Sequence, residues 1–305
     1  MAWHSRRGAP GGGLREVDRP EWNAGTHVGH LRHRQRQDRN LARAGKRRPG
    51  NAVVARLAVV VPVFNEPSIG RTLEGLYRQQ HRDGVSVYVV DNASTDDTRA
   101  RIASFLAGRD GFPLTVLEEP VKGTGAASDT GFRRAITDGF ALVCRTDGDS
   151  VPRPDWTGRI LAGFAARPGL ALLGGRSVPL DDAYRRAGDA LVIPAAFLVL
   201  RAALAAGHFD RSYLRLVAGH NLATRAAAYE QVGGFPRTSI AERDEDIEYT
   251  LRVARTLGRA AVRIDRGLVV ATSMRRIRAY GPARAAVHQL LPGLRGTLGR
   301  DADIR

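Results

Sequence analysis

The segment Leu57-Ala58-Val59-Val60-Val61-Pro62-Val63 is a continuous apolar run, which predicts a β-strand buried on both faces. A polar turn, Phe64-Asn65-Glu66-Pro67, follows it, and residues 69–80 then carry apolar side chains at helical spacing. Three further strands are predicted along the chain, at residues 85–90, 114–117 and 141–144. Helical segments separate these strands. Such alternation indicates an α/β fold with a mostly parallel central sheet flanked by helices.

Polar and charged residues follow the ends of the predicted strands: Asn65-Glu66, Asp91, Lys122, Asp147 and Asp149. Ligands of parallel sheets bind beyond the carboxyl ends of the strands, so we expect these side chains to share one site. Asp147 and Asp149 are two residues apart and leave the same face of an extended backbone. Two carboxylates at a strand end suit Mg²⁺ or Mn²⁺, held together with substrate phosphates. Ordinary turn chemistry of Asp-Gly-Asp is the alternative.

Five motifs resemble, in order and spacing, the inverting family 2 glycosyltransferases of GT-A fold: Val59–Glu66, Val89–Thr98, Lys122-Gly123, Asp147-Gly148-Asp149 and Glu245-Asp246. The resemblance covers residues 56–275. It implies transfer of a sugar from a nucleotide-diphosphate donor to an acceptor hydroxyl, with Mg²⁺ or Mn²⁺ as cofactor. It also implies that Asp149 binds the metal and that Asp147 faces the ribose or the sugar.

The resemblance assigns further residues to the donor. Pro62 and Val63 are expected beside the nucleobase, and Glu66 near the ribose. Asp91 is expected to accept the imide N–H of a uracil or similar base, with an Asx-type cap of the next helix as the alternative. Lys122 is expected to contact the donor, and a solvated loop cation is its alternative.

Asp246 matches the general base of the family. Inverting transfer needs a group that takes the proton of the acceptor hydroxyl as its oxygen attacks the anomeric carbon. Apolar residues at helical spacing after Asp246 predict that it lies in the first turn of a helix ending near Gly258. The helix dipole there favours an ionised carboxylate, although acidic residues also occur in first turns for that reason alone. Glu245 is a candidate to support the base.

Two segments resemble the acceptor side of the family, residues 219–225 and Gly233-Gly234-Phe235. The resemblance suggests that Gly234 lets its loop approach the sugar closely. Asn221 could donate to a sugar hydroxyl or be a buried structural residue. Arg275 and Arg276 could bind the departing diphosphate or be surface charges.

The ends of the chain differ in composition from its middle. Residues 1–55 are rich in Arg, Gly and His and poor in apolar residues, which predicts a disordered basic segment. Residues 56–275 are predicted to form the glycosyltransferase domain, and residues 276–305 a C-terminal helix and tail. The single cysteine, Cys144, excludes an intramolecular disulfide and fits a reducing compartment. A cytoplasmic location is therefore expected.

The formal net charge of +16 indicates an anionic partner. Basic segments attract anionic lipid headgroups and bind nucleic acid as well. No recognition helix or zinc-finger spacing accompanies the charge, so nucleic acid is the less expected partner. A lipid-linked or membrane acceptor is favoured, with a peripheral position at the inner face of the membrane. The apolar run Ala190–Leu200 is too short to span a bilayer, which takes about 20 residues, and could form a buried or an interfacial helix.

Two other functions are weighed against glycosyl transfer. A sugar-phosphate nucleotidyltransferase has a similar sheet, but it would need a basic, glycine-rich loop after the first strand. This chain has the acidic turn Phe64–Pro67 there. A non-catalytic nucleotide-sugar or polyanion-binding protein would not need Asp147, Asp149 and Asp246, which are all present.

Overall fold

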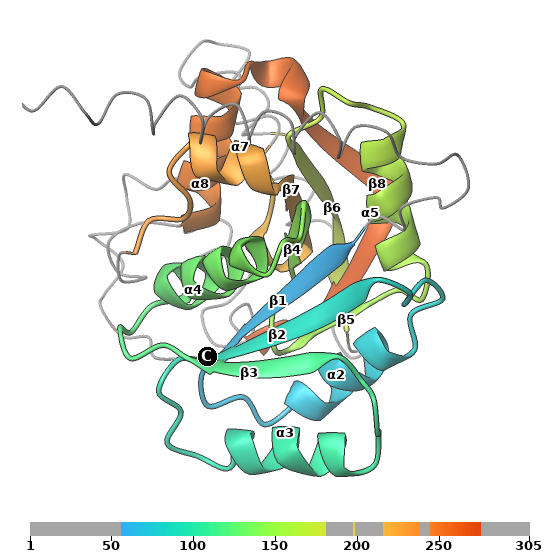
Figure 1. Ribbon diagram of the computed structural model, residues 1–305, viewed down its shortest axis with the longest axis vertical. Helices are drawn as coiled ribbons and strands as arrows, with labels where there is room; N and C mark the ends of the chain where they lie inside the picture. Colours follow the sequence, from blue (N-terminus) through green and yellow to red (C-terminus); the bar gives the residue numbers. More distant parts are fainter. Residues whose placement is uncertain (1–55, 181–197, 199–215, 238–244, 276–305) are drawn as a thin grey trace, which may run out of the picture. The chain divides into compact units, whose positions relative to one another are not determined.

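The computed structural model describes residues 56–180, 198, 216–237 and 245–275 (Figure 1). The predictions made for residues 1–55 and 276–305 lie outside this range. So do those for Arg276 and for the apolar run 190–200, apart from Leu198.

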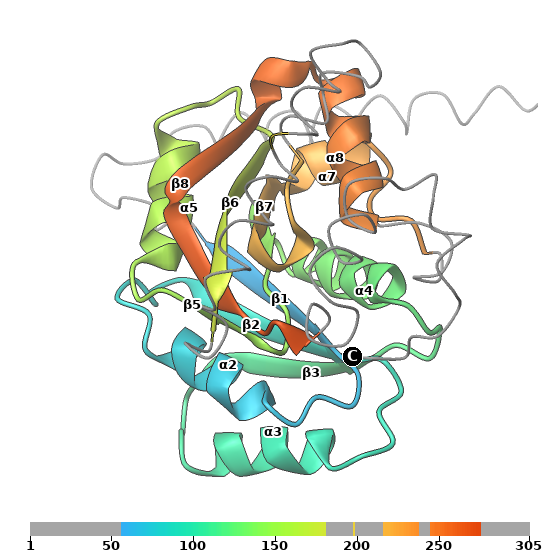
Figure 2. The same cartoon turned by 180° about the vertical axis from the view of Figure 1, so that it is seen from behind.

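A single mixed sheet organises the described residues. Its eight strands lie in the order β3-β2-β1-β4-β7-β6-β8-β5. Their bounds are β1 Leu57–Val63, β2 Val85–Asp91, β3 Leu114–Glu118, β4 Leu142–Arg145, β5 Ser150–Pro152, β6 Leu172–Pro179, β7 Leu222–Arg225 and β8 Val262–Thr272. The first four strands pair in parallel, which confirms the fold class predicted from the sequence. Beyond them, β7 runs antiparallel to both β4 and β6, and β8 pairs in parallel with β6 and antiparallel with β5 (Figure 2).

Helices cover both faces of this sheet. They are α2 Ile69–Tyr77, α3 Thr98–Ala107, α4 Thr124–Thr137, α5 Trp156–Ala165, α7 Ala226–Gln231 and α8 Glu245–Thr256, with 3₁₀ turns η3 Gly219–Asn221 and η4 Arg259–Ala261. One hydrophobic core lies under α2, α3 and α5, and the other lies under α4, α7 and α8 (Figures 1 and 2). Every residue of β1 is buried, with alternate side chains in the two cores, as its continuous apolar run predicts.

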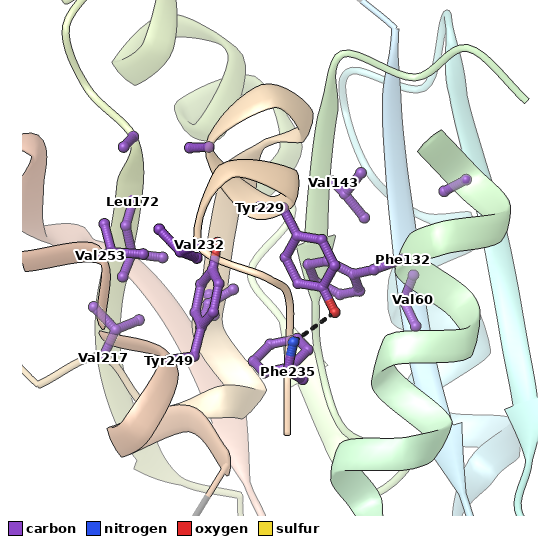
Figure 3. Close-up of a cluster of buried hydrophobic side chains, with 14 of the residues drawn as sticks. Val60, Phe132, Val143, Leu172, Val217, Tyr229, Val232, Phe235, Tyr249 and Val253 are labelled. Carbon is purple, nitrogen blue, oxygen red and sulfur yellow. Dashed lines mark hydrogen bonds between the residues drawn. The ribbon is translucent and has the colours of Figure 1, made fainter. Parts of the chain in front are cut away.

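The second core holds a cluster of four aromatic rings that joins α4 to α8 (Figure 3). Phe132 of α4, Tyr229 of α7, Phe235 and Tyr249 of α8 pack with ring centroids 4.8–5.5 Å apart. The hydroxyl of Tyr229 accepts the backbone N–H of Phe235 at 2.9 Å. The cluster therefore fixes α8, which carries Glu245 and Asp246, against the parallel half of the sheet.

Candidate functional site

Hydrogen bonds join the loops that follow the first three strands. The backbone N–H of Asn65 donates to the hydroxyl of Ser94, and the Asn65 side-chain oxygen accepts the N–H of Thr95. The Asn92 side chain donates to the carbonyls of Glu119 and Val121 and accepts the N–H of Gly123. These contacts bring the turn after β1, the loop after β2 and the loop that carries Lys122 together at one edge of the sheet.

Two of the predicted donor residues have protein partners of their own. Asp91 is fully buried, accepts the backbone N–H of Ser94 at 3.1 Å and pairs with Arg99. Asp91 therefore forms a turn with Ser94 but does not cap the next helix, the alternative weighed for it, because α3 begins at Thr98 with Asp97 at its N-cap position. The ammonium of Lys122 lies 4.9 Å from the centre of the Phe64 ring, a cation–π contact over the turn after β1.

Pro62 and Val63 lie within β1 and are both buried. Val63 packs against Gly148, because a Cβ atom added at residue 148 would lie 2.9 Å from the Val63 side chain and 3.0 Å from that of Glu66. The hydroxyl of Thr72 donates to the Gly148 carbonyl at 2.7 Å. The Asp147-Gly148-Asp149 segment is therefore held directly against the end of β1, and it needs glycine in the middle for this close approach.

Glu66, Asp149 and Arg275 form the first ionic cluster of the site. The Arg275 guanidinium lies 3.0 Å from a carboxylate oxygen of Asp149 and also pairs with Glu66. Burial raises the pKa of the Asp149 carboxyl, as do the nearby charges of Asp147 and Glu66, while Arg275 acts in the opposite direction. Arg275 thus belongs to the site, between two of its carboxylates.

Arg145 holds the second ionic cluster, and sequence reasoning missed it. Its side chain is only 4% exposed and pairs with Asp147 at 2.9 Å and with Glu245 at 2.8 Å. Burial acts to lower the pKa of Arg145, but the charges of Asp147, Glu245 and Asp246 raise it overall. A signal was present in the sequence, since a charged residue ends the otherwise apolar strand β4.

Asp246 lies in the first turn of α8, which confirms the placement predicted from the apolar spacing. One of its carboxylate oxygens accepts the backbone N–H of Gly219 at 2.7 Å, and the other accepts the N–H of Ile247 at 2.8 Å. The carboxylate is therefore oriented by backbone donors from η3 and from its own helix.

Asn221 and Gly234, which were expected on the acceptor side, both make close contacts with other residues of the protein. Asn221 is fully buried: its oxygen accepts the indole N–H of Trp156 at 2.9 Å, and its amide donates to two backbone carbonyls at 3.1 Å. Gly234 has a φ of +73°, and an added Cβ would lie 2.8 Å from a carboxylate oxygen of Asp129. These contacts favour the structural alternative for Asn221 and give Gly234 a packing role.

The carboxylates at the end of β4 fit a divalent cation that takes its remaining ligands from elsewhere. Asp149 and Glu66 already share one positive group, the Arg275 guanidinium. Within the described ranges, no group of three or more His, Cys, Asp or Glu side chains is placed to hold a metal ion.

None of the described helices has the length and apolar character needed to cross a bilayer.

Comparison with known proteins gives a family and a set of related folds. The sequence model of Glycosyl transferase family 2 matches residues 58–232. Mannosyltransferase PcManGT from Pyrobaculum calidifontis, solved with GDP-Man and Mn²⁺, is 24% identical over 92% of this chain and 74% of that chain, with a TM-score of 0.58. Glucosyl-3-phosphoglycerate synthase from Mycobacterium tuberculosis, solved with Mn²⁺, UDP and glucosyl-3-phosphoglycerate, is 19% identical over 94% of this chain and 88% of that chain, with a TM-score of 0.53. A fragment of TarS from S. aureus is 17% identical, with a TM-score of 0.50, and the match spans 77% of this chain but 65% of that chain.

Proposed function

The chain belongs to glycosyl transferase family 2, and we propose that it moves a sugar from a nucleotide-diphosphate donor to an acceptor hydroxyl with inversion, assisted by Mg²⁺ or Mn²⁺. One observation carries the proposal: carboxylates from the end of β4 and from the first turn of α8 meet at one buried guanidinium, that of Arg145. The solved relatives that bind GDP-Man or UDP together with Mn²⁺ share this fold.

Asp246 is the proposed general base. An effective base must begin deprotonated and point at the hydroxyl whose proton it takes. The N–H groups of Gly219 and Ile247 donate to its two oxygens, which fixes the orientation of the carboxylate. The proton passes from the acceptor hydroxyl to Asp246 while the hydroxyl oxygen attacks the anomeric carbon on the face opposite the leaving diphosphate.

Asp149 is the proposed metal ligand, with Glu66 beside it, and Asp147 is proposed to face the ribose or the sugar. When bound, a divalent cation would offset the charge that develops on the leaving diphosphate. Arg275 and Lys122 are proposed to bind the same diphosphate from the protein side. Asp91 at the end of β2 remains the proposed partner of the nucleobase.

A lipid-linked acceptor and a peripheral membrane position remain predictions that rest on the net charge of the chain. Family membership argues against the nucleotidyltransferase and non-catalytic alternatives.

Two substitutions test the proposed roles. We expect Asp149→Ala and Asp246→Asn each to abolish transfer, but only Asp149→Ala to weaken metal-dependent donor binding, because Asp246 acts on the acceptor. Transfer would be assayed by nucleotide release from a panel of UDP-, GDP- and dTDP-sugars, and binding by calorimetry. Glu248→Gln is the matched control, since Glu248 lies in the same helical turn and contacts Arg252. Equal loss of donor binding in both variants would contradict the assigned roles.

A further inference from the structure

We propose that Arg145 is a positioning residue that fixes the donor-side carboxylate Asp147 and the base-bearing end of α8 in one geometry. The inference rests on the proposed function and adds to it a residue that touches neither substrate. Its basis is a set of contacts among β4, η3 and α8.

The first observation is that one buried cation joins two distant parts of the chain. Arg145 contacts Asp147, two residues later, and Glu245, which is 100 residues away in sequence. The exposed fractions of the side chains are 4% for Arg145, 33% for Asp147 and 12% for Glu245. Asp147 is partly exposed to solvent at the proposed donor site, while Arg145 is buried. Arg145 is therefore placed to fix the Asp147 carboxylate from the buried side.

The second observation concerns Gly219. A Cβ atom added there would lie 2.8 Å from the central carbon of the Arg145 guanidinium, so the backbone of η3 packs directly on that group. The N–H of the same residue donates to Asp246 at 2.7 Å. Arg145 thus supports the base in two ways, through Glu245 beside it in α8 and through the backbone that orients its carboxylate.

The chemistry of the side chain suits this role better than lysine would. A guanidinium presents five N–H donors in a rigid planar fork and stays charged when buried. It can bind two carboxylates that approach from different directions, whereas an ammonium on a flexible stem fixes neither direction. A shift of about 1 Å in a reacting group can lower the rate about 100-fold.

Arg145→Met tests the inference, with Arg145→Lys as the conservative variant. We expect Arg145→Met to lower kcat about 100-fold, with the KM for the donor changed by less than about tenfold, because the base and Asp147 lose their common support while the other donor contacts remain. Arg145→Lys should recover part of kcat, since it restores the charge but not the fork. Arg109→Met is the matched control: Arg109 also pairs with a carboxylate, that of Glu74, but lies beyond α3, away from the site.

A coupling measurement separates positioning from a general loss of stability. Glu245→Gln should lower kcat in the wild-type background and have little further effect in Arg145→Met, because both changes break the same link. Thermal unfolding shows whether each variant is folded, and Arg145→Lys serves if Arg145→Met is not. The inference is overturned if folded Arg145 variants keep the wild-type kcat, or if the Glu245 and Arg145 effects multiply independently. A wild-type chain that binds no nucleotide-sugar would instead refute the proposed function itself.

Discussion

Arg275 offers a quantitative test of the metal site. Its guanidinium lies between Glu66 and Asp149, whose side chains are 7% and 22% exposed, and is itself 29% exposed. The guanidinium occupies one carboxylate oxygen of Asp149, so a divalent cation that binds this oxygen has to displace it. Arg275→Ala should therefore destabilise the metal-free protein and strengthen binding of the metal on its own.

The magnitude follows from the burial of the pair. Breaking a fully buried ion pair costs about 3–5 kcal/mol, and an exposed pair contributes about 0–1 kcal/mol. The partly buried Arg275 pairs lie between these limits, at about 2 kcal/mol. That corresponds to a fall in Tm of roughly 4–8 °C for a domain of this size. The same 2 kcal/mol predicts about 30-fold tighter Mn²⁺ binding by the variant in the absence of nucleotide.

The assay is thermal unfolding of the wild type and of Arg275→Ala, in EDTA and in millimolar MnCl₂. Mn²⁺ should raise the Tm of the variant more than that of the wild type, because the stabilisation by a bound ligand grows with the logarithm of its concentration divided by its Kd. Adding Asp149→Ala to Arg275→Ala should abolish the increase in Tm that Mn²⁺ causes. Equal effects of Mn²⁺ on wild type and variant, or no loss of Tm in EDTA, would refute the reasoning.

Two further predictions concern the framework around the site. Gly234→Ala should lower the free energy of unfolding, measured in urea, by more than about 1 kcal/mol, because residue 234 has a positive φ and the added methyl group would meet Asp129. The control Gly70→Ala, at an open helical position, should raise the free energy of unfolding by about 0.5–1 kcal/mol. An unchanged free energy of unfolding in Gly234→Ala would contradict the packing role of Gly234. Trp156→Phe should lower the free energy of unfolding by about 1–3 kcal/mol, because the buried Asn221 oxygen loses the indole N–H that it accepts. Calorimetry should show that the Kd of the nucleotide-sugar changes less than twofold. A large change in that Kd would indicate that Asn221 contacts the substrate.

Local sequence patterns predicted the elements that frame the site. The first strand was predicted at the observed bounds Leu57–Val63, because seven consecutive apolar residues fit a strand with both faces buried. The predicted strand 141–144 is β4, Leu142–Arg145, and Asp246 is in the predicted helical turn. These features depend on residues close together in the sequence, so the spacing of apolar residues was enough to predict them.

Long-range partners could not be predicted in this way. The pairing of Arg145 with Glu245, of Trp156 with Asn221 and of Arg275 with Glu66 spans 65 to 209 residues. Such contacts depend on the order in which β7, β6 and β8 follow β4 in the sheet, and no local pattern specifies that order. The sequence therefore indicated the carboxylates and Arg275 as candidates, but it revealed neither the carboxylate partners of Arg275 nor the part played by Arg145.

The most direct test of the central claim is calorimetric titration of the protein with UDP-, GDP- and dTDP-sugars, first with Mn²⁺ and then with EDTA. We expect one nucleotide-sugar to bind in the presence of Mn²⁺ and to be released when EDTA removes the metal. This result would also identify the nucleobase that the site accepts. Binding of none of these donors, in a protein shown to be folded by its thermal transition, would contradict the proposed donor site.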